Sequence, residues 1–334
     1  MILVVTHRRG FEADFVIDIL RSQDVPVVRV NLDEYPFPAT MTARWKDRIF
    51  DGMYRDNRKE ILFDDVSVAW LQQVRRFDST SEMLTPSERI IAAEKEAFIG
   101  GLWDSASWSW VNHPTVVETA SNKLYQLRVA QQLGFAIPRT FVTADEEKAI
   151  AFIDQCADNA IIKDMATQTF VVNNQDYMSY TRKISADDIR RRGIPGGIPV
   201  CIQENVTKHR EIRATVVGDR VFSVAIDSQA EESTKDDYRH GDLSKSEHYS
   251  AITLSTDTEE RCVTLVRSLG LDYGAVDLIE RVEGGAVFLE VNTTGAWVWA
   301  EKLTSLPISA ALADLLISRY QSGSGEDVRA PNAS

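Results

Sequence analysis

The sequence predicts a mixed α/β protein, in which a parallel-sheet domain precedes a smaller α/β unit and an antiparallel sheet. Three observations support this fold class. Near the N-terminus an apolar run, an amphipathic stretch and a second apolar run follow one another, as in a β-α-β unit. Later, alternating apolar segments flank the turns Gly218-Asp219 and Gly284-Gly285, as in antiparallel hairpins. The 334 residues suffice for two or three compact units.

The first predicted domain covers residues 1–115. Residues 2–5 are an apolar run typical of a buried parallel strand, and residues 12–23 have apolar side chains at helical spacing. The turn between them has no G-x-G-x-x-G, so the sequence does not predict a dinucleotide site there. The other predicted elements are a strand at 26–30, an antiparallel addition at 43–51 and 60–63, a strand at 66–70, and a helix at 86–102 that Ser87 could cap.

Arg75 and Arg76 lie in the loop beyond the strand at 66–70. Open α/β sheets bind ligands at the carboxyl ends of their strands. Contact with an acidic substrate is one interpretation of these two cations, and a pair of solvated side chains is the other.

The second predicted domain covers residues 116–202, and the third covers 203–321. In the second, Ser121-Asn122-Lys123 opens a helix that Gly134 stops. The third contains a hairpin at 211–226, a polar segment at 228–250 that we expect to be a mobile loop, and helices at 258–270 and 307–320. Residues 322–334 are rich in Gly, Ser, Glu and Asn and are expected to be a disordered tail.

Composition excludes several classes of protein. The net charge of −13 argues against non-specific nucleic-acid binding, which needs a basic surface. The three cysteines form no C-x-x-C and are expected to be buried thiols in a reducing compartment. No apolar run approaches the roughly 18 residues of a membrane span, and no signal-peptide pattern is present, so we expect a cytoplasmic protein.

The hairpin that contains Asp277, Glu290 and Asn292 is the candidate metal site. Strand alternation predicts that Leu289 and Val291 face one way, while Phe288, Glu290 and Asn292 face the other. Carboxylates and an amide oxygen on a rigid hairpin suit Mg²⁺, which binds through one or two carboxylates together with substrate phosphates. The alternative interpretation is a solvated acidic hairpin.

Lys123 and Lys163 each lie at the edge of an apolar element, where a lysine is uncommon without a partner. Two ammonium groups can neutralise triphosphate charge. Neither lysine lies in G-x-x-x-x-G-K-[ST], and no H-R-D or D-F-G occurs, so the chain is neither a P-loop NTPase nor a protein kinase. Two solvated lysines are the alternative.

Glu211 and Arg213 are two positions apart on a predicted strand and therefore share a face, and Arg239 follows in the polar segment. Arginine near a transferring phosphoryl group stabilises the charge that develops there. Ordinary polar alternation along a strand is the alternative interpretation.

The order of these motifs resembles that of the ATP-grasp superfamily, whose fold combines a Rossmann-like first domain, a central lid and a C-terminal antiparallel sheet. By this resemblance Lys123 and Lys163 bind phosphates. Gln203-Glu204-Asn205-Val206 is the adenine hinge, with backbone contacts from Glu204 and Val206. Glu211 contacts the ribose. The resemblance assigns the Mg²⁺ of Mg-ATP to Asp277, Glu290 and Asn292.

A narrower resemblance is to the graspetide (microviridin-type) peptide macrocyclases. It rests on the stretches around Asn122-Lys123-Leu124, Glu211-Ile212-Arg213, Ile226-Asp227-Ser228-Gln229 and Glu290-Val291-Asn292-Thr293. This resemblance implies a homodimer that takes a ribosomally made precursor peptide, leader plus core. It implies that Asp or Glu side chains are activated as acyl phosphates and closed onto Thr, Ser or Lys, with Arg213 and Arg239 stabilising the phosphates.

The loop at 165–169 departs from the pattern because it lacks the glycines of many ATP-grasp lids, and the hydroxyls of Thr167 and Thr169 are possible substitutes. Two alternatives to macrocyclisation remain open. One is a ligase that adds free amino acids to a peptide or protein, as ribosomal-protein glutamate ligases do. The other is a non-catalytic nucleotide- or peptide-binding module. Arg75-Arg76 and the 228–250 segment are candidates for leader recognition.

Overall fold

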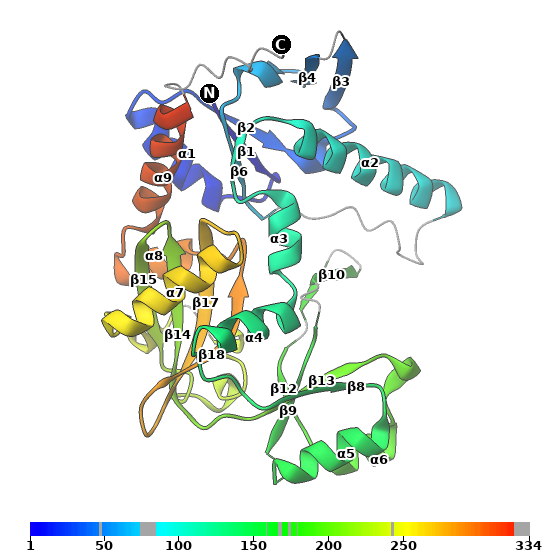
Figure 1. Cartoon of the computed structure of the whole chain (residues 1–334), viewed down its shortest axis with the longest axis vertical. Coiled ribbons are helices and arrows are strands. Elements are labelled where there is room, and N and C mark those ends of the chain that lie inside the picture. The colour runs from blue at the N-terminus through cyan, green and yellow to red at the C-terminus, as the bar shows by residue number, and fades with distance from the viewer. Residues whose placement is uncertain are drawn as a thin grey trace, which may run out of the picture.

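The computed structural model describes residues 1–46, 49–73, 85–157, 159–165, 169–172, 175–178, 180–241 and 244–323. Arg75, Arg76, Thr167 and residues 324–334 of the predicted tail lie outside these residues. The tail was predicted to start at 322, but Ser322 and Gly323 still belong to the helix Ile308–Gly323. Figure 1 shows the N-terminal domain at the top, with the C-terminal sheet and the central domain below it. Among the described residues, no helix combines the length and apolar character needed to cross a membrane.

The N-terminal domain is built on a four-stranded parallel sheet with the order β2-β1-β6-β7. Alternate residues of β1 enter two different cores. Ile2 and Val4 pack with α1, while Leu3 and Val5 pack with α2 and a tryptophan cluster. The elements are β1 (Ile2–Thr6), α1 (Glu12–Ser22), β2 (Val27–Asn31), β6 (Val68–Leu71), α2 (Pro86–Ser105) and β7 (Ser109–Val111).

The predicted antiparallel addition at 43–51 and 60–63 is confirmed as a three-stranded antiparallel sheet, in which Arg44 pairs with Asp51. One local prediction for this domain was wrong. The cap of α2 is Thr85 and not Ser87, because Thr85 accepts from the Glu88 N–H and Glu88 bonds back to the Thr85 N–H. The antiparallel elements are β3 (Thr40–Lys46), β4 (Ile49–Arg55) and β5 (Glu60–Leu62).

The central domain is a small antiparallel sheet with the order β12-β9-β13-β8, covered on one side by α5 and α6 (Figure 1). Two helices, α3 (Pro114–Ala120) and α4 (Lys123–Gln132), connect it to the N-terminal domain. Helix α4 begins at Ser121-Asn122-Lys123 as predicted, with Asn122 as its N-cap. The other elements are β8 (Thr140–Thr143), α5 (Glu146–Gln155), β9 (Ala160–Lys163), the hairpin β10 (Thr169–Val172) with β11 (Gln175–Met178), β12 (Arg182–Ile184), α6 (Ala186–Arg192) and β13 (Val200–Glu204).

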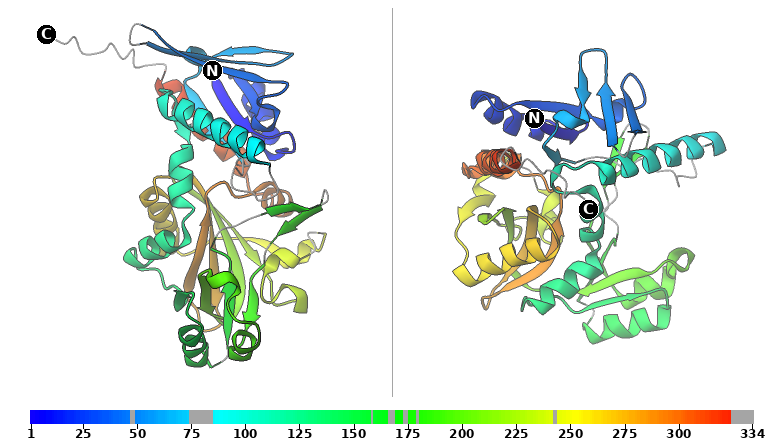
Figure 2. Two further views of the ribbon diagram at one scale, coloured as in Figure 1. Left: turned by 90° about the vertical axis from the view of Figure 1, so that its right-hand side faces the viewer. Right: turned by 45° about the horizontal axis from the view of Figure 1, so that its top comes forward.

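The C-terminal domain is a five-stranded antiparallel sheet with the order β16-β15-β14-β17-β18. Helices α4 and α7 cover one face, and α9 lies beside α1, so the sheet shares a core with the N-terminal domain (Figures 1 and 2). The elements are β14 (Lys208–Val217), β15 (Arg220–Ile226), β16 (Tyr249–Ile252), α7 (Thr256–Ser268), β17 (Tyr273–Arg281), β18 (Ala286–Asn292), α8 (Val298–Thr304) and α9 (Ile308–Gly323).

The polar segment at 228–250 is more structured than its composition indicated. It contains three turns of 3-10 helix, at Glu232–Thr234, Tyr238–His240 and Ser246–His248, and it ends in β16. Thr234 and Asp237 are buried within it. The described part of this segment is therefore a loop built from short turns, and its expected mobility stays a prediction.

The predicted alternation of side chains along β18 was wrong, because β18 contains a β-bulge. Asp277 pairs with Glu290, but the next residue, Leu278, pairs with Phe288, so Leu289 has no partner across the pair. Phe288 consequently enters the core with Val291, whereas Leu289 shares a face with Glu290. The predicted common face of Glu290 and Asn292 is present, but Phe288 lies on the opposite one.

Candidate functional site

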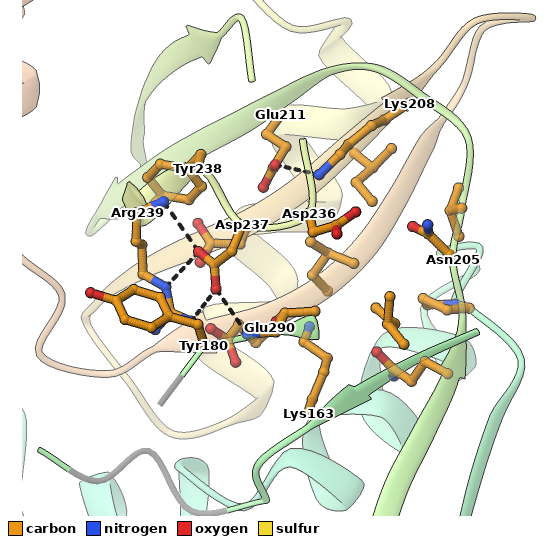
Figure 3. Close-up of a pocket in the computed structure, with 18 of the residues that line it drawn as sticks. Lys163, Tyr180, Asn205, Lys208, Glu211, Asp236, Asp237, Tyr238, Arg239 and Glu290 are labelled. Atoms are coloured by element: carbon orange, nitrogen blue, oxygen red, sulfur yellow. Dashed lines mark hydrogen bonds and ion pairs between the residues drawn. The ribbon is translucent and has the colours of Figure 1, made fainter. Parts of the chain in front are cut away.

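One pocket between the central domain and the C-terminal sheet brings all the predicted site residues together (Figure 3). Strands β9 and β13 line one side, while β14, β17 and β18 line the other. The predicted residues that line it are Lys123, Lys163, Gln203, Glu204, Val206, Glu211, Arg213, Arg239, Asp277, Glu290 and Asn292.

Sequence reasoning missed several residues of this pocket. Tyr180 and Thr181 come from the connection between β11 and β12, and Asp236, Asp237 and Tyr238 come from the polar segment. No motif marks these residues, since both segments read as ordinary polar connections. Lys208 was also missed, although its position three residues before Glu211 at the start of a strand was a usable signal.

The floor of the pocket is the hairpin of β17 and β18. Asp277 and Glu290 are directly opposite across the two strands, and the Asn292 Nδ2 donates to Asp277 Oδ2 at 2.8 Å. The Lys123 Nζ lies 3.0 Å from Glu290 Oε2. The hairpin therefore presents carboxylate and amide groups toward one space, as its sequence predicted. No three His, Cys, Asp or Glu side chains of the described residues cluster as a metal site, so a cation here would depend on substrate phosphates for further ligands.

The two carboxyl groups of the floor have opposite pKa shifts. Burial raises the pKa of Asp277 to about 7, against the effect of Arg213, and the charges of Glu290 and Glu211 add to the increase. Burial also favours protonation of Glu290, but Lys163 and Lys123 outweigh it and lower the pKa to about 2. Glu290 is thus the constant anion of the pair, and Figure 3 shows Lys163 reaching toward it from the central domain.

Arg213 is a buried cation whose guanidinium is only partly used. Its Nη2 donates to the Tyr238 hydroxyl at 2.7 Å, and its Nε lies 3.1 Å from Asp277 Oδ1. The angle of that ion pair does not make a hydrogen bond, so Arg213 Nε and Nη1 and Asp277 Oδ1 are buried without hydrogen-bond partners. Burial by itself would lower the pKa of Arg213. The charge of Asp277 and the contact with Tyr238 have the larger effect, so the pKa of Arg213 is raised. The site therefore holds a permanent cation with donors to spare.

The hinge residues 203–206 lie where β13 leaves the central sheet. The Glu204 carboxylate points to Arg139, with Oε2 2.6 Å from Arg139 Nε, and the Glu204 N–H donates to the Arg139 carbonyl. Any bond from the Glu204 backbone to a ligand would therefore come from its carbonyl. Gln203 Nε2 donates to Thr140 Oγ1 at 2.9 Å, while its buried Oε1 has no hydrogen-bond partner.

Glu211 forms a buried ion pair with Lys208. Their Oε1 and Nζ atoms are 2.6 Å apart, and both side chains are less than a tenth exposed, at 9% and 8%. Because β14 alternates, Glu211 and Arg213 face the pocket while Ile212 and Ala214 lie in the core, as predicted.

Comparison with known protein families agrees with this architecture. Residues 120–316 match the RimK-like ATP-grasp domain, and residues 1–118 match the MvdD pre-ATP-grasp domain. The chain belongs to the RimK-like ATP-grasp family. It is accordingly an ATP-grasp ligase, with the mixed α/β fold expected from the order of its motifs.

Curated relatives of this ATP-grasp ligase are glutamate ligases. The tetrahydromethanopterin:alpha-L-glutamate ligase of Methanocaldococcus jannaschii is 26% identical over 64% of this chain and 71% of its own length. A probable alpha-L-glutamate ligase of an Enterobacter species is 25% identical over 60% of this chain and 65% of its own.

Solved structures similar to this ligase cover more of it. A RiPP-associated ATP-grasp ligase from Chryseobacterium gregarium, in complex with ADP and a leader and core peptide, is 27% identical, has a TM-score of 0.85, and matches over 95% of this chain and 96% of its own. The macrocyclase MdnC from Microcystis aeruginosa, bound with precursor peptide MdnA, shares the fold with a TM-score of 0.82 at 24% identity, over 95% of this chain and 99% of its own.

Proposed function

We propose that this ATP-grasp ligase closes ω-ester or ω-amide macrocycles on a ribosomally made precursor peptide. The observation that carries the proposal is the extent of the similarity to the Chryseobacterium gregarium ligase, which spans 95% of this chain and includes the first domain. The matches to the two glutamate ligases above cover 64% and 60% of the chain. The first domain also belongs with the pre-ATP-grasp type named after MvdD, over residues 1–118.

In this proposal the pocket holds Mg-ATP. The unpartnered Arg213 donors and the two lysines provide positive charge where phosphates would lie, and the hinge closes the opposite end. The proposed roles are Lys123 and Lys163 for phosphates, Gln203, Glu204 and Val206 for adenine, Glu211 for ribose, Arg213 and Arg239 for the reacting groups, and Asp277, Glu290 and Asn292 for Mg²⁺.

The donor set fits Mg²⁺. Asp277 Oδ1 is a buried oxygen without a hydrogen-bond partner, and Glu290 is held ionised beside it. The Asn292 amide nitrogen is engaged by Asp277, which leaves the amide oxygen as the group to meet a cation. Bound Mg²⁺ would neutralise phosphate charge and favour attack at the terminal phosphorus.

The proposed reaction has two steps. A carboxylate oxygen of the peptide attacks the γ-phosphorus of ATP, and the bond to the β-phosphate oxygen breaks, releasing ADP and leaving an acyl phosphate. A hydroxyl or amine of the same peptide then attacks the acyl carbon, loses its proton and displaces phosphate. Arg213 and Arg239 would stabilise the charge on the transferred group, and enclosure by the pocket would keep water from the acyl phosphate.

A second candidate is addition of free glutamate to a peptide or protein, which the names of the curated relatives favour. The two reactions differ in mass. Macrocyclisation removes one water for each ring, whereas ligation adds a residue mass.

The test is mass spectrometry of a precursor peptide incubated with the protein, Mg²⁺ and ATP, with and without glutamate. The peptide to use is one encoded by a short neighbouring reading frame with Thr/Ser and Asp/Glu near its C-terminus. Water loss that depends on ATP supports macrocyclisation, and a gain of glutamate masses supports the second candidate. ATP binding without turnover in the presence of that peptide would instead indicate a non-catalytic module.

The homodimer implied by the resemblance belongs to this proposal and is checked by sedimentation equilibrium.

A further inference from the structure

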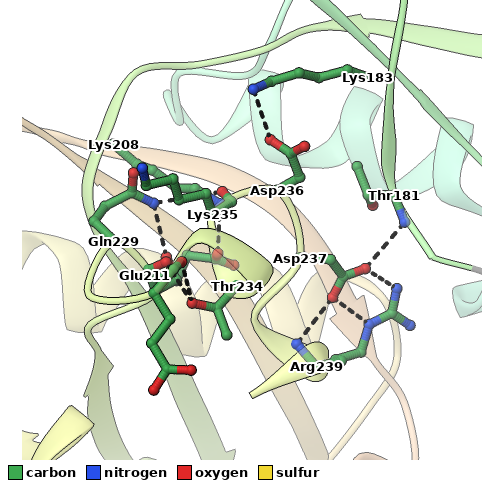
Figure 4. Close-up of polar contacts among 12 residues, drawn as sticks. Thr181, Lys183, Lys208, Glu211, Gln229, Thr234, Lys235, Asp236, Asp237 and Arg239 are labelled. Atoms are coloured by element: carbon green, nitrogen blue, oxygen red, sulfur yellow. Dashed lines mark hydrogen bonds and ion pairs between the residues drawn. The ribbon is translucent and has the colours of Figure 1, made fainter.

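Two segments from different domains meet beside the pocket. Residues 180–183 run from the connection after β11 into the first two residues of β12 in the central domain, and residues 236–240 lie in the polar segment of the C-terminal domain. Both segments line the pocket, through Tyr180 and Thr181 on one side and Asp236 to Arg239 on the other. We call these two segments the clasp. Figure 4 shows their polar contacts.

Asp237 is at the centre of the clasp. Its Oδ2 accepts from the Thr181 N–H at 3.1 Å, so the carboxylate bonds directly to the backbone of the other domain. Its Oδ1 accepts from the Arg239 N–H at 3.1 Å and from Arg239 Nε at 2.8 Å, and Arg239 Nη2 pairs with Oδ2. Asp237 is only 6% exposed. Arg239 lowers its pKa despite burial, so the carboxylate stays ionised at neutral pH.

Aromatic and ionic contacts surround this carboxylate. The Tyr180 ring stacks on His240 with centroids 3.9 Å apart at 29°, and the Arg239 guanidinium lies 5.3 Å from the same ring. The Lys183 Nζ lies 3.5 Å from Asp236 Oδ1. Every one of these contacts joins a group of the central domain to a group of the C-terminal domain.

Arg239 belongs to the clasp and also lines the pocket, so it connects the contacts between the domains with the candidate reaction site. Its guanidinium is fixed on one edge by Asp237 and on one face by Tyr180, and it lines the pocket beside Tyr238, which in turn holds Arg213. A planar guanidinium held on an edge and a face has few orientations left. Losing the carboxylate would release both the arginine and the Thr181 N–H.

We propose that Asp237 is a positioning residue that fastens the central domain to the C-terminal domain beside a bound nucleotide and orients Arg239 into the pocket. The clasp slows nucleotide release and shields the acyl phosphate from water. The first part requires only that a nucleotide occupies the pocket, and the second rests on the proposed function.

The test of the first part measures how fast the fluorescent nucleotide mant-ADP leaves the full-length protein when excess ADP displaces it in a stopped-flow instrument. Asp237→Asn replaces an ion that accepts four hydrogen bonds with a neutral amide, and we expect release to become about tenfold faster or more. Tyr180→Ala removes the aromatic contact from the other domain and should also accelerate release. Both changes open the same clasp. The fold-increase in release rate for the double variant should therefore be smaller than the product of the fold-increases for the two single variants.

Glu12→Gln is the matched control. Glu12 is also a buried carboxylate, 4% exposed, that accepts backbone and side-chain hydrogen bonds, but it does not line the pocket. Thermal melting of both variants compares their loss of stability. Faster release in Asp237→Asn but not in Glu12→Gln supports the proposal, and equal release rates for Asp237→Asn and the unaltered protein overturn it. If Asp237→Asn does not fold, unchanged release in Tyr180→Ala overturns it.

The second part is tested by the ratio of ADP formed to rings closed on the precursor peptide. We expect that ratio to rise in Asp237→Asn, because more acyl phosphate is hydrolysed before the ring closes. An unchanged ratio with faster nucleotide release would overturn the shielding role alone. If the unaltered protein closes no rings, the proposed function fails, while the release measurement still decides the role of Asp237 in holding nucleotide.

Discussion

The pocket face of the C-terminal sheet and the outer edge of its β17–β18 hairpin differ in how their buried polar groups are hydrogen-bonded. On the pocket face, Asp277 Oδ1 and Arg213 Nη1 are buried without hydrogen-bond partners. At the outer edge, the Gln126 carboxamide accepts from the Val291 N–H at 2.9 Å and donates to the Val291 and Ala120 carbonyls at 2.8 and 2.7 Å. A buried polar atom without a partner costs roughly 1–3 kcal/mol. The pocket face retains such atoms while the edge does not, and a ligand bound on that face would supply the missing hydrogen-bond partners.

A second buried amide completes the edge. Asn112 accepts from the N–H groups of Asp272 and Tyr273 and donates to the carbonyls of Tyr273 and Thr293. Thr293 follows directly after Asn292, and Val291 precedes it. The two amides therefore support the backbone on both sides of the candidate ligand Asn292, from α4 and from the end of β7.

The largest effect is expected from breaking the pocket face. Asp277→Asn, or Glu290→Gln combined with Asn292→Ala, should reduce ATP-dependent peptide modification by about 100-fold or more, because the Mg²⁺ contribution is worth several kcal/mol. The measurement is kcat by mass spectrometry, with circular dichroism to verify folding. Glu280→Gln, on the same strand but outside the pocket, is the control and should keep its activity. Normal turnover in the Asp277 variant would refute the metal assignment.

A smaller effect is expected from changing how the pocket cation is held. Arg213→Lys keeps the charge but loses the planar fork, and we expect kcat to fall by about 10- to 100-fold. Tyr238→Phe leaves Arg213 in place and removes one hydrogen bond, so a reduction of about fivefold is expected. Steady-state kinetics with ATP and peptide varied in turn check this order. A Tyr238→Phe effect as large as that of Arg213→Lys would contradict it.

Removing the hydrogen bonds at the outer edge of the hairpin should lower the stability of the protein and leave its catalytic rate unchanged. Gln126→Leu leaves the Val291 N–H and C=O without their buried partner, and the free energy of unfolding should fall by about 2–4 kcal/mol. Urea denaturation measures this change, and kcat per folded molecule should stay close to that of the unaltered protein. Gln131→Leu on the exposed face of the same helix is the control, with an expected change within about 0.5 kcal/mol. Equal losses in both variants would show that Gln126 has no special part.

The smallest effect is expected at the hinge. Arg139→Ala removes a solvent-exposed ion pair with Glu204, and such pairs contribute little. If the hinge acts through its backbone, the KM for ATP should stay within about twofold of its original value. A much larger change in KM would show that the Glu204 carboxylate itself takes part in nucleotide binding.

Much of the site could be predicted from the sequence because its signals are local. Lys123 follows an N-cap, Lys163 ends an apolar strand, and Glu211 and Arg213 are two apart on a strand, so their positions follow from short-range rules. The resemblance to a known family then joined these local signals through their order, and the pocket contains every one of them.

The sequence by itself determined the class of fold, the strand and helix positions near these motifs, and the chemical character of the pocket floor. Only the tertiary structure decided that Phe288 turns into the core, because a bulge depends on the register with a partner strand. Only the tertiary structure brought Asp237 to Thr181, which lies 56 positions earlier in the chain. Residue type and spacing specify local geometry, but contacts between distant segments depend on how whole domains pack, and no short pattern carries that information.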